Sequence, residues 1–306
     1  MQSHLASIVM LLVTMVIWGS TFVVTKGVNE QVQPFTLALV RVAIGAVVLL
    51  GCALLRQARG GNHSPWSALP WRTMIAMGLI GVVLYYAVFN YSLVYTSASQ
   101  GALVQSCIPA MTALVAVVWL REHASAMRWA GIGLSMVGVL IVFSGGADAE
   151  AGSASLLGNV LMFISAVLWG VYTSMAKRVA TYDPLQVTAG IVGAGAVMLV
   201  PLAAFEVGAE GMPSVDLQGW LGMAYLGAGA SGAAYLMYSA ALKHVDASEA
   251  GVYTNLIPIV GVITGMMLGD PLSARAIIGG LVVLVGVWLT SRQPAPASPP
   301  RTSTAP

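Results

Sequence analysis

Aromatic, amide and hydroxyl side chains recur at helical spacing inside long apolar stretches of this sequence. Trp18 and Thr21 lie three residues apart, and Tyr86 and Asn90 lie four apart, so each pair falls on one face of a helix. Flat rings and neutral amides suit a small zwitterionic or aromatic molecule. The candidate residues for binding such a molecule or lining its path are Trp18, Thr21, Tyr86, Asn90, Gln105, Trp169, Tyr172, Tyr235, Tyr238 and Asn255.

Three further residues are candidates for a hinge or gate. Pro109 and Pro258 each fall inside an apolar stretch, where proline removes a backbone donor and can kink a helix. A packing kink without a functional role is equally supported. Arg41 is the only basic residue well inside such a stretch, which makes it a functional candidate. Because it lies only about 10 Å of helix from Pro34, a structural or gating role is favoured over direct contact.

Groups that would mark an active centre or a metal site are missing from the apolar stretches. No Asp or Glu falls at the middle of one, and Cys52 and Cys107 behave there as small hydrophobic residues. The histidines fall near the ends of the chain or in loops, at His4, His63, His123 and His244. The sequence therefore predicts no metal, no cofactor and no enzyme. It also does not support a proton relay, for which Glu249 is the one acid to keep in reserve.

The composition identifies the surroundings of these residues. Charged residues make up 8% of the 306 residues, against roughly 25% in an average soluble domain. Hydrophobic residues reach 58% and the mean hydropathy is +0.85. A soluble enzyme is nearly excluded, and a net charge of +2 spread over so few groups makes nucleic acid an unlikely partner. The expected surroundings are a lipid bilayer.

Charges and turn residues divide the chain into ten candidate spans. Because the runs are continuously apolar and do not alternate, they predict helices and not a barrel. The uncharged stretch from Thr73 to Leu120 is too long for one crossing, and we divide it between Tyr95 and Ser99. The expected spans are approximately 5–26, 35–55, 72–94, 99–120, 127–144, 156–176, 184–205, 217–242, 248–269 and 274–291.

The basic residues predict which side each loop faces. With ten spans, ten Lys and Arg residues fall on the side that holds both termini and two on the other, so the termini are expected in the cytoplasm. The opposite loops are expected to hold seven acidic residues, among them Glu206. The tail over 292–306 is rich in Pro, Ser and Ala and is expected to be disordered.

The two halves of the chain resemble each other. Trp18-Gly19 recurs as Trp169-Gly170 at an offset of 151, and Pro109 recurs as Pro258 at an offset of 149. Each half, 5–146 and 154–291, thus carries five spans. Since five is odd, the halves run through the membrane in opposite senses. This inverted repeat is typical of secondary transporters, whose site lies between the halves.

Alternative interpretations remain for the aromatic and hydroxyl residues. Trp18 and Trp169 are equally well explained as anchors at the membrane interface. A single threonine such as Thr21 is more simply explained by a bond to its own helix backbone. The deeper residues Tyr86 and Tyr235 are as well explained by packing as by lining a path, and so are Asn90 and Gln105.

The segment Trp18-Gly19-Ser20-Thr21-Phe22, followed by Lys26, Pro34 and Arg41, resembles the opening of the EamA family in the drug/metabolite transporter superfamily. Asn90, Pro109 and Leu120-Arg121-Glu122 continue the resemblance, and the second half repeats it with Pro258, Asp270 and Gly286. The second half has no arginine that matches Arg41. The resemblance implies ten helices, a central cavity and movement of small metabolites, most often outward.

The combined expectation is an all-α integral protein of the cytoplasmic (inner) membrane. It would export amino acids or related compounds by alternating access, as a uniporter or exchanger. A proton-coupled drug or metabolite antiporter is the first alternative, and a channel or sensor is the second. The expected partners are a small-molecule substrate and the bilayer. The oligomeric state stays open, and a monomer is compatible with the sequence.

Overall fold

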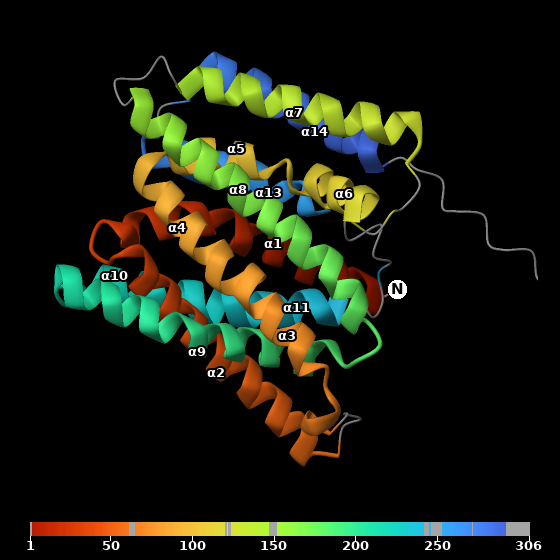
Figure 1. Ribbon diagram of the computed structural model, residues 1–306, viewed down its shortest axis with the longest axis vertical. Helices are drawn as coiled ribbons and strands as arrows, with labels where there is room; N and C mark the ends of the chain where they lie inside the picture. The colour runs from red at the N-terminus through yellow and green to blue at the C-terminus, as the bar shows by residue number, and fades with distance from the viewer. Residues whose placement is uncertain are drawn as a thin grey trace, which may run out of the picture.

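The computed structural model describes residues 2–60, 65–119, 121, 124–146, 152–241, 245, 253–270 and 272–291. Within these ranges every regular element is a helix and no strand occurs. The long helices run back and forth along one direction of the molecule (Figure 1). The predicted tail, 292–306, lies outside the described residues, and so do Glu122 and Glu249.

The α-helices follow one another with short connections. Two 3₁₀ turns, Trp66–Ala68 and Lys177–Val179, add to them. The α-helices are α1 (Gln2–Asn29), α2 (Pro34–Ala58), α3 (Trp71–Gly78), α4 (Tyr85–Tyr95), α5 (Ala98–Gln105), α6 (Ile108–Trp119), α7 (Ala126–Gly146), α8 (Gly152–Ala176), α9 (Pro184–Glu210), α10 (Leu217–Ala224), α11 (Ala234–Ala241), α13 (Leu256–Met267) and α14 (Ala274–Ser291).

Several of these helices suit a bilayer in length and composition. Large apolar side chains cover their outer faces, with Val47 and Val197 each 72% exposed and Phe205 78% exposed. Soluble monomeric proteins rarely expose such large apolar surfaces to water. The chain is therefore a membrane protein, as the composition predicts. Eight helical stretches among the described residues are long and apolar enough to cross, namely His4–Asn29, Pro34–Ala58, Trp71–Tyr95, Ala98–Trp119, Ala126–Ser144, Leu156–Val179, Pro184–Glu210 and Ala274–Ser291.

The division of the uncharged stretch falls where the sequence predicts it. Helix α4 ends at Tyr95 and α5 begins at Ala98. Between them Ser97 is the N-cap of α5, and its hydroxyl accepts a hydrogen bond from the backbone N–H of Gln100 at 3.1 Å. A serine cap satisfies one of the free donors at a helix start, so the small hydroxyl residues turn the chain here.

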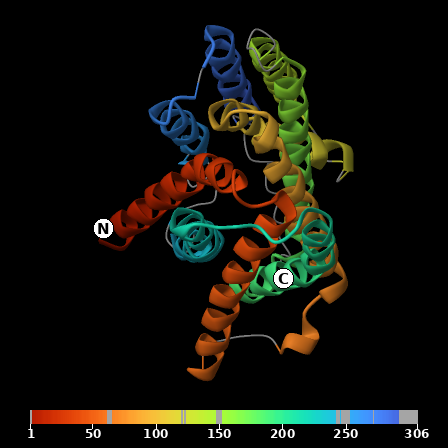
Figure 2. The ribbon, with the colours of Figure 1, turned by 90° about the vertical axis from the view of Figure 1, so that its left-hand side faces the viewer.

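Helices α7 and α14 pack side by side at one edge of the bundle (Figures 1 and 2). Glycines make this approach close and reciprocal. A Cβ on Gly131 would lie 2.7 Å from the carbonyl oxygen of Gly286, and a Cβ on Gly138 would lie 2.7 Å from that of Gly279. Small residues let helix backbones meet in a membrane, where there is no hydrophobic force between helices. The glycines therefore determine the packing of this pair.

Helices α2 and α9 form a second pair and are antiparallel. At one end Arg56, near the end of α2, forms an ion pair with Asp183, the N-cap of α9. At the other end the Glu206 carboxylate, near the end of α9, accepts hydrogen bonds from the backbone N–H groups of Phe35 and Thr36 at the start of α2. The prediction that Glu206 lies in a loop is wrong, because the residue is helical and only 4% exposed.

Four interruptions modify the inner helices. A π-helical segment, Leu79–Leu84, joins α3 to α4, and a second, Tyr225–Ala233, joins α10 to α11. Turns at Ser106–Cys107 and at Asn255 come just before Pro109 and Pro258. Such departures from α geometry often occur at functional sites.

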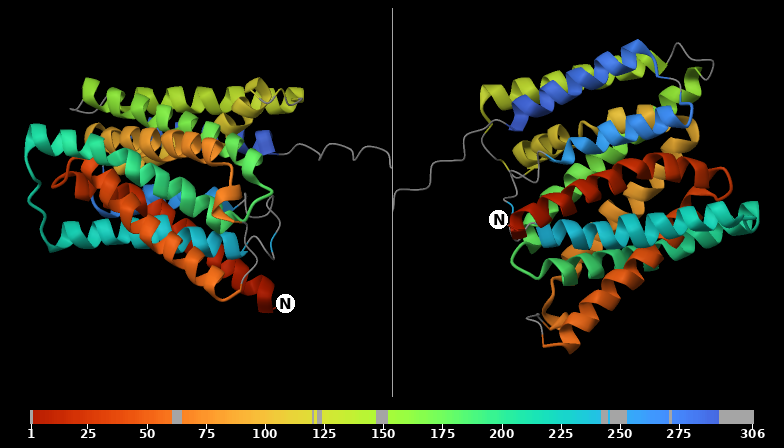
Figure 3. Two further views of the ribbon diagram at one scale, coloured as in Figure 1. Left: turned by 60° about the horizontal axis from the view of Figure 1, so that its bottom comes forward. Right: turned by 180° about the vertical axis from the view of Figure 1, so that it is seen from behind.

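The remaining helices cross the middle of the molecule. Seen from behind, α14, α13, α1 and the run from α10 to α11 follow one another as adjacent rows (Figure 3, right). Helix α1 packs against both α13 and α11, and α8 packs against α4 and α6. The first described residue and the end of α14 lie at the same end of the bundle (Figure 1).

Candidate functional site

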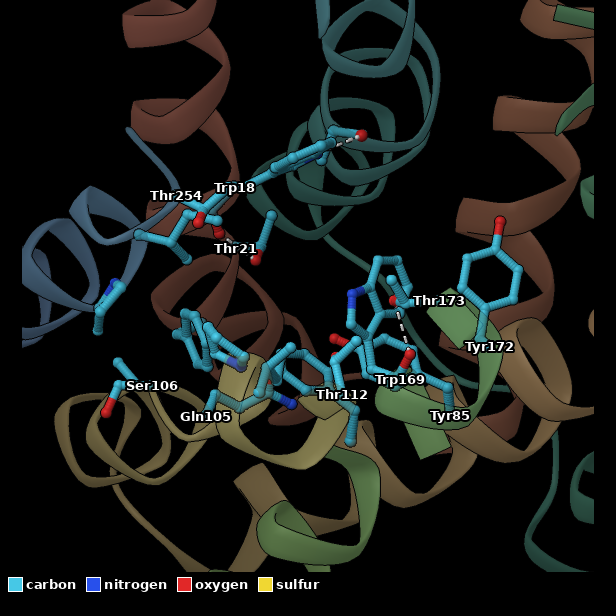
Figure 4. Close-up of a pocket in the computed structure, with 18 of the residues that line it drawn as sticks. Trp18, Thr21, Tyr85, Gln105, Ser106, Thr112, Trp169, Tyr172, Thr173 and Thr254 are labelled. Atoms are coloured by element: carbon cyan, nitrogen blue, oxygen red, sulfur yellow. Dashed lines mark hydrogen bonds between the residues drawn. The ribbon is translucent and has the colours of Figure 1, made fainter. Parts of the chain in front are cut away.

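A cavity of about 400 Å³ lies among the inner helices. This volume is within the range of about 300 to 1,000 Å³ found for small-molecule sites. Side chains from both halves of the chain point into it (Figure 4). The lining residues are Trp18, Thr21, Phe22, Arg41, Tyr85, Tyr86, Phe89, Ala102, Gln105, Ser106, Ile108, Pro109, Thr112, Trp169, Tyr172, Thr173, Ala230, Tyr235, Tyr238, Thr254, Asn255, Ile257 and Pro258.

One wall of the cavity is an aromatic group built around Trp18 of α1. Its ring centroid lies 5.4 Å from that of Tyr235 and 5.4 Å from that of Tyr238, both on α11. The indole N–H donates to the carbonyl oxygen of Ala230 at 3.1 Å, which fixes the orientation of the ring. The ring thus lines the cavity.

The facing wall is a second aromatic group, built around Trp169 of α8. Its ring centroid lies 4.9 Å from that of Tyr85 on α4 and 5.1 Å from that of Tyr172 on its own helix. Tyr86 touches Tyr85 at 5.1 Å. Edge and offset contacts of this kind hold rings rigidly. The cavity therefore has preformed flat surfaces on two sides.

Two lining threonines bond the backbone of their own helices. Thr21 donates to the carbonyl oxygen of Trp18 at 2.6 Å, and Thr173 donates to that of Trp169 at 2.8 Å. The Gln105 side-chain amide donates to Ser165 Oγ at 2.7 Å, and the residue lines the cavity (Figure 4). Thr21 thus bonds its own backbone and also lines the cavity, so the two interpretations of this residue are compatible.

The two prolines lie where the inner helices are interrupted. Pro109 has no N–H with which to bond the carbonyl of Gln105 four residues earlier, and Pro258 is related in the same way to Thr254. All four residues line the cavity. Each proline thus interrupts the α-helical hydrogen-bond pattern at the wall of the cavity.

Arg41 projects from α2 to the cavity and is 3% exposed. Its guanidinium carbon lies 4.3 Å from the centroid of the Tyr86 ring, and its Nη1 donates to Thr25 Oγ1 at 3.4 Å. It is the one charged side chain among the described lining residues, which include no carboxylate and no histidine. Among described residues, no group of three or more His, Cys, Asp or Glu residues gathers to hold a metal.

The structure brings nine of the ten candidate path residues together at this cavity, along with Arg41, Pro109 and Pro258. Asn90 is placed elsewhere. It is fully buried, its side-chain NH₂ donates to the main-chain carbonyl of Pro34 at 2.9 Å, and its main-chain carbonyl accepts from the Asn29 side chain at 2.8 Å. This geometry joins α4 to the turn between α1 and α2.

Sequence reasoning missed several lining residues. Tyr85 is the most prominent, because it links the Trp169 group to Tyr86. The adjacent pair Tyr85-Tyr86 was the available signal, since two tyrosines side by side span about 100° of a helix. Ser106 and Thr112, near Pro109, also line the cavity.

The chain is similar to known transporters along most of its length. The model of the EamA-like transporter family matches residues 5–144 and 156–292. The uncharacterized transporter YyaM of Bacillus subtilis is 27% identical over 292 residues, 95% of both chains. An uncharacterized transporter of Archaeoglobus fulgidus is 28% identical over 284 residues, 92% of this chain and 96% of the relative. A probable terminal-alkyne amino-acid exporter of Streptantibioticus cattleyicolor is 25% identical over 286 residues, 92% of each.

A protein of known crystal structure shares the fold. It matches with a TM-score of 0.61 over 92% of this chain and 95% of its own, at 21% identity. The likeness concerns architecture, whereas the family match covers both halves of the sequence. The chain belongs to the EamA-like transporter family of the drug/metabolite transporter superfamily, and it is a transmembrane transporter and not an enzyme.

Proposed function

We propose that the protein is a secondary transporter that exports small organic metabolites, amino acids or related compounds, across the cytoplasmic (inner) membrane. It works by alternating access, as a uniporter or exchanger. The observation that carries this proposal is the cavity between two preformed aromatic walls, each built from residues of both halves of the chain. The relative named as a probable amino-acid exporter supports the substrate class.

The proposed architecture is ten crossings in two inverted repeats, 5–146 and 154–291, with both termini in the cytoplasm. To the eight apolar stretches it adds the helical run 217–241 and the segment that ends in α13. The bias of Lys and Arg supports the orientation, and the shared end of the termini supports an even number of crossings.

Reciprocal contacts support the repeat. Trp18 meets Tyr235, while Trp169 meets Tyr85, and the members of each type lie 151 and 150 residues apart. The contacts between α7 and α14 exchange in the same way, since their glycines repeat at an offset of 148. When each residue of such a contact is replaced by its equivalent in the other half, a second observed contact results. This is expected when a two-fold axis relates the two inverted halves. Rocking of the halves would then open the cavity to each side in turn.

An efflux screen tests the proposal. Cells that overproduce the chain are grown with toxic amounts of amino acids, nucleosides and drugs, and the export of any tolerated compound is measured. We expect tolerance to at least one amino-acid-like compound and its loss in Tyr86→Ala. Tyr95→Ala is the matched control, because Tyr95 ends the same helix and is 39% exposed outside the cavity. Tolerance to no compound would refute an exporter.

Two further measurements separate the alternatives. Flux driven by a pH gradient in proteoliposomes, and lost in Glu249→Gln, would favour a proton-coupled antiporter over the uniporter or exchanger. Saturable uptake accelerated by substrate on the opposite side is expected of a carrier. Flux that does not saturate would indicate a channel, and binding without flux would indicate a sensor.

A further inference from the structure

We infer that Arg41 is the anion-binding group of the cavity, so that the transported compound carries a carboxylate beside an aromatic or branched apolar body. This inference deepens the proposed function and rests on it. The sequence favoured a structural or gating role for Arg41, and the placement of the residue argues against that preference. The guanidinium lies at the cavity, and none of the residues that the structure describes supplies a counter-ion for it.

The guanidinium of Arg41 has few hydrogen-bond acceptors among the described residues. It carries five N–H donors, and among described residues the only acceptor is Thr25 Oγ1, at the long distance of 3.4 Å. Nε is buried without any acceptor. The Tyr86 ring covers one face of the guanidinium at 4.3 Å. A ring on the face positions the planar group and leaves its edge, where the donors point, for another partner.

Two other charged side chains of the fold have partners within the protein, in contrast to Arg41 among the described residues. Arg56 is paired with Asp183, and buried Glu206 accepts four hydrogen bonds. Arg41 is 3% exposed, yet no carboxylate of the described chain lies within ion-pair distance. A buried cation without a partner is costly, and arginine stays protonated in proteins. A ligand carboxylate is the partner that completes this site.

The walls of the cavity suit a ligand with an apolar body. The Trp18 and Trp169 groups supply flat apolar walls on two sides of about 400 Å³. No described lining residue is acidic, so an added ammonium group meets only rings, hydroxyls and carbonyls. The carboxylate is therefore the group that the cavity selects, and an amine without a carboxylate is disfavoured by the like charge of Arg41.

Matched probes test the inference on the purified full chain. We use phenyl, indole and branched aliphatic bodies, each as a carboxylate, a primary amide and a primary amine, and measure dissociation constants by calorimetry. The expected result is that at least one carboxylate binds at least about tenfold more tightly than its amide and its amine. In Arg41→Gln the binding of that carboxylate should weaken by about 10- to 100-fold, as expected for loss of hydrogen bonds to a charged group. The amide should change by less than about threefold.

Two variants separate this role from a structural one. Arg178→Gln is the matched control, because Arg178 also lies over a ring, that of Trp119 at 5.1 Å, but outside the cavity. It should bind as the wild type does. Arg41→Lys keeps the charge without the paired donors and should bind the carboxylate with intermediate affinity. Equal loss for carboxylate and amide in Arg41→Gln would overturn the inference in favour of a structural role.

The outcomes also distinguish the inference from the proposed function. Preference for amides or amines in binding and in proteoliposome flux would overturn the role of Arg41 and leave the transporter proposal standing. Carboxylate-selective binding without flux would support the role of Arg41 and contradict the transport mechanism. Binding of none of the probes would overturn the inference, because it assigns this cavity to these bodies.

Discussion

Replacing Glu206 with glutamine should destabilise the protein by about 3 kcal/mol, although the side chain hardly changes in size. The Glu206 carboxylate accepts from Phe35 N at 3.1 Å and Tyr91 Oη at 3.1 Å through Oε1, and from Thr36 N at 2.7 Å and Thr36 Oγ1 at 2.9 Å through Oε2. It therefore caps the start of α2, where the side chain of the N-cap residue Gln33 makes no capping hydrogen bond.

The magnitude follows from these four bonds. A hydrogen bond to a charged group contributes about 1.5–3 kcal/mol and a neutral one about 0.5–1.5 kcal/mol. Glutamine keeps one acceptor oxygen, but this oxygen is neutral. The two hydrogen bonds that it still accepts therefore weaken by roughly 1 kcal/mol each. Its NH₂ group then faces the N–H of Thr36, and a buried unpaired donor costs about 1–3 kcal/mol. Local relaxation recovers part of this sum, which leaves about 3 kcal/mol.

The assay is unfolding in mixed micelles with increasing dodecyl sulfate, followed by helical circular dichroism. Glu210→Gln is the matched control, because Glu210 lies one turn further along α9 and is exposed. It should change the free energy of unfolding by less than about 0.5 kcal/mol. Thr36→Val and the double variant complete a cycle, in which coupling with Glu206→Gln is expected. Equal stability of the two glutamine variants would refute the capping role.

Two glycine substitutions give further predictions. Gly138→Val should separate α7 from α14 and lower the free energy of unfolding by about 1–3 kcal/mol, because a Cβ at this position would lie 2.6 Å from Val283 N. Gly133→Ala is the control, because a Cβ there would have nothing within 4 Å. Equal effects of the two substitutions in the same micelle titration would contradict this packing. Gly81→Ala should lower substrate affinity about tenfold, the effect of about 1.4 kcal/mol, because its Cβ would overlap the ring of Tyr172. Gly27→Ala, with open space around it, should bind normally in calorimetry, and unchanged affinity of Gly81→Ala would show that the ring position is unimportant.

Much of the fold could be predicted from the sequence, because a bilayer imposes simple demands on it. Apolar length, turn residues and charge gave most helices to within a few residues, including the turn between Tyr95 and Ala98. Aromatic residues at helical spacing pointed to six of the residues that line the cavity. In each case the signal is local, since a polar or aromatic side chain on an apolar helix must face protein and not lipid.

The predictions failed where the neighbour, and not the helix face, decides. Asn90 lies on the same face of α4 as Tyr86, one turn further along. At that position the face meets the main-chain carbonyl of Pro34, the first residue of α2, and not the cavity. Tyr85 was missed because the cavity extends around α4 beyond one face. Glu206 was assigned to a loop since an acid near a helix end is usually exposed. Its partners are Phe35 and Thr36 of α2, about 170 residues away along the chain, and Tyr91 of α4, and no local pattern reveals them.

Arg41 and Glu206 are both buried charges, and they should respond to neutralisation in opposite ways. The fold surrounds Glu206 with four donors, whereas the described part of the chain gives Arg41 one long hydrogen bond and a ring. Removing a buried charge that the protein leaves unpaired costs little and can stabilise. Arg41→Met, which keeps most of the stem packing, should therefore unfold within about 1 kcal/mol of the wild type or above it, without ligand. A loss of more than about 2 kcal/mol in the micelle titration would mean that the fold itself needs this charge. The stability of this variant therefore tests, without any ligand, whether Arg41 is kept for a substrate.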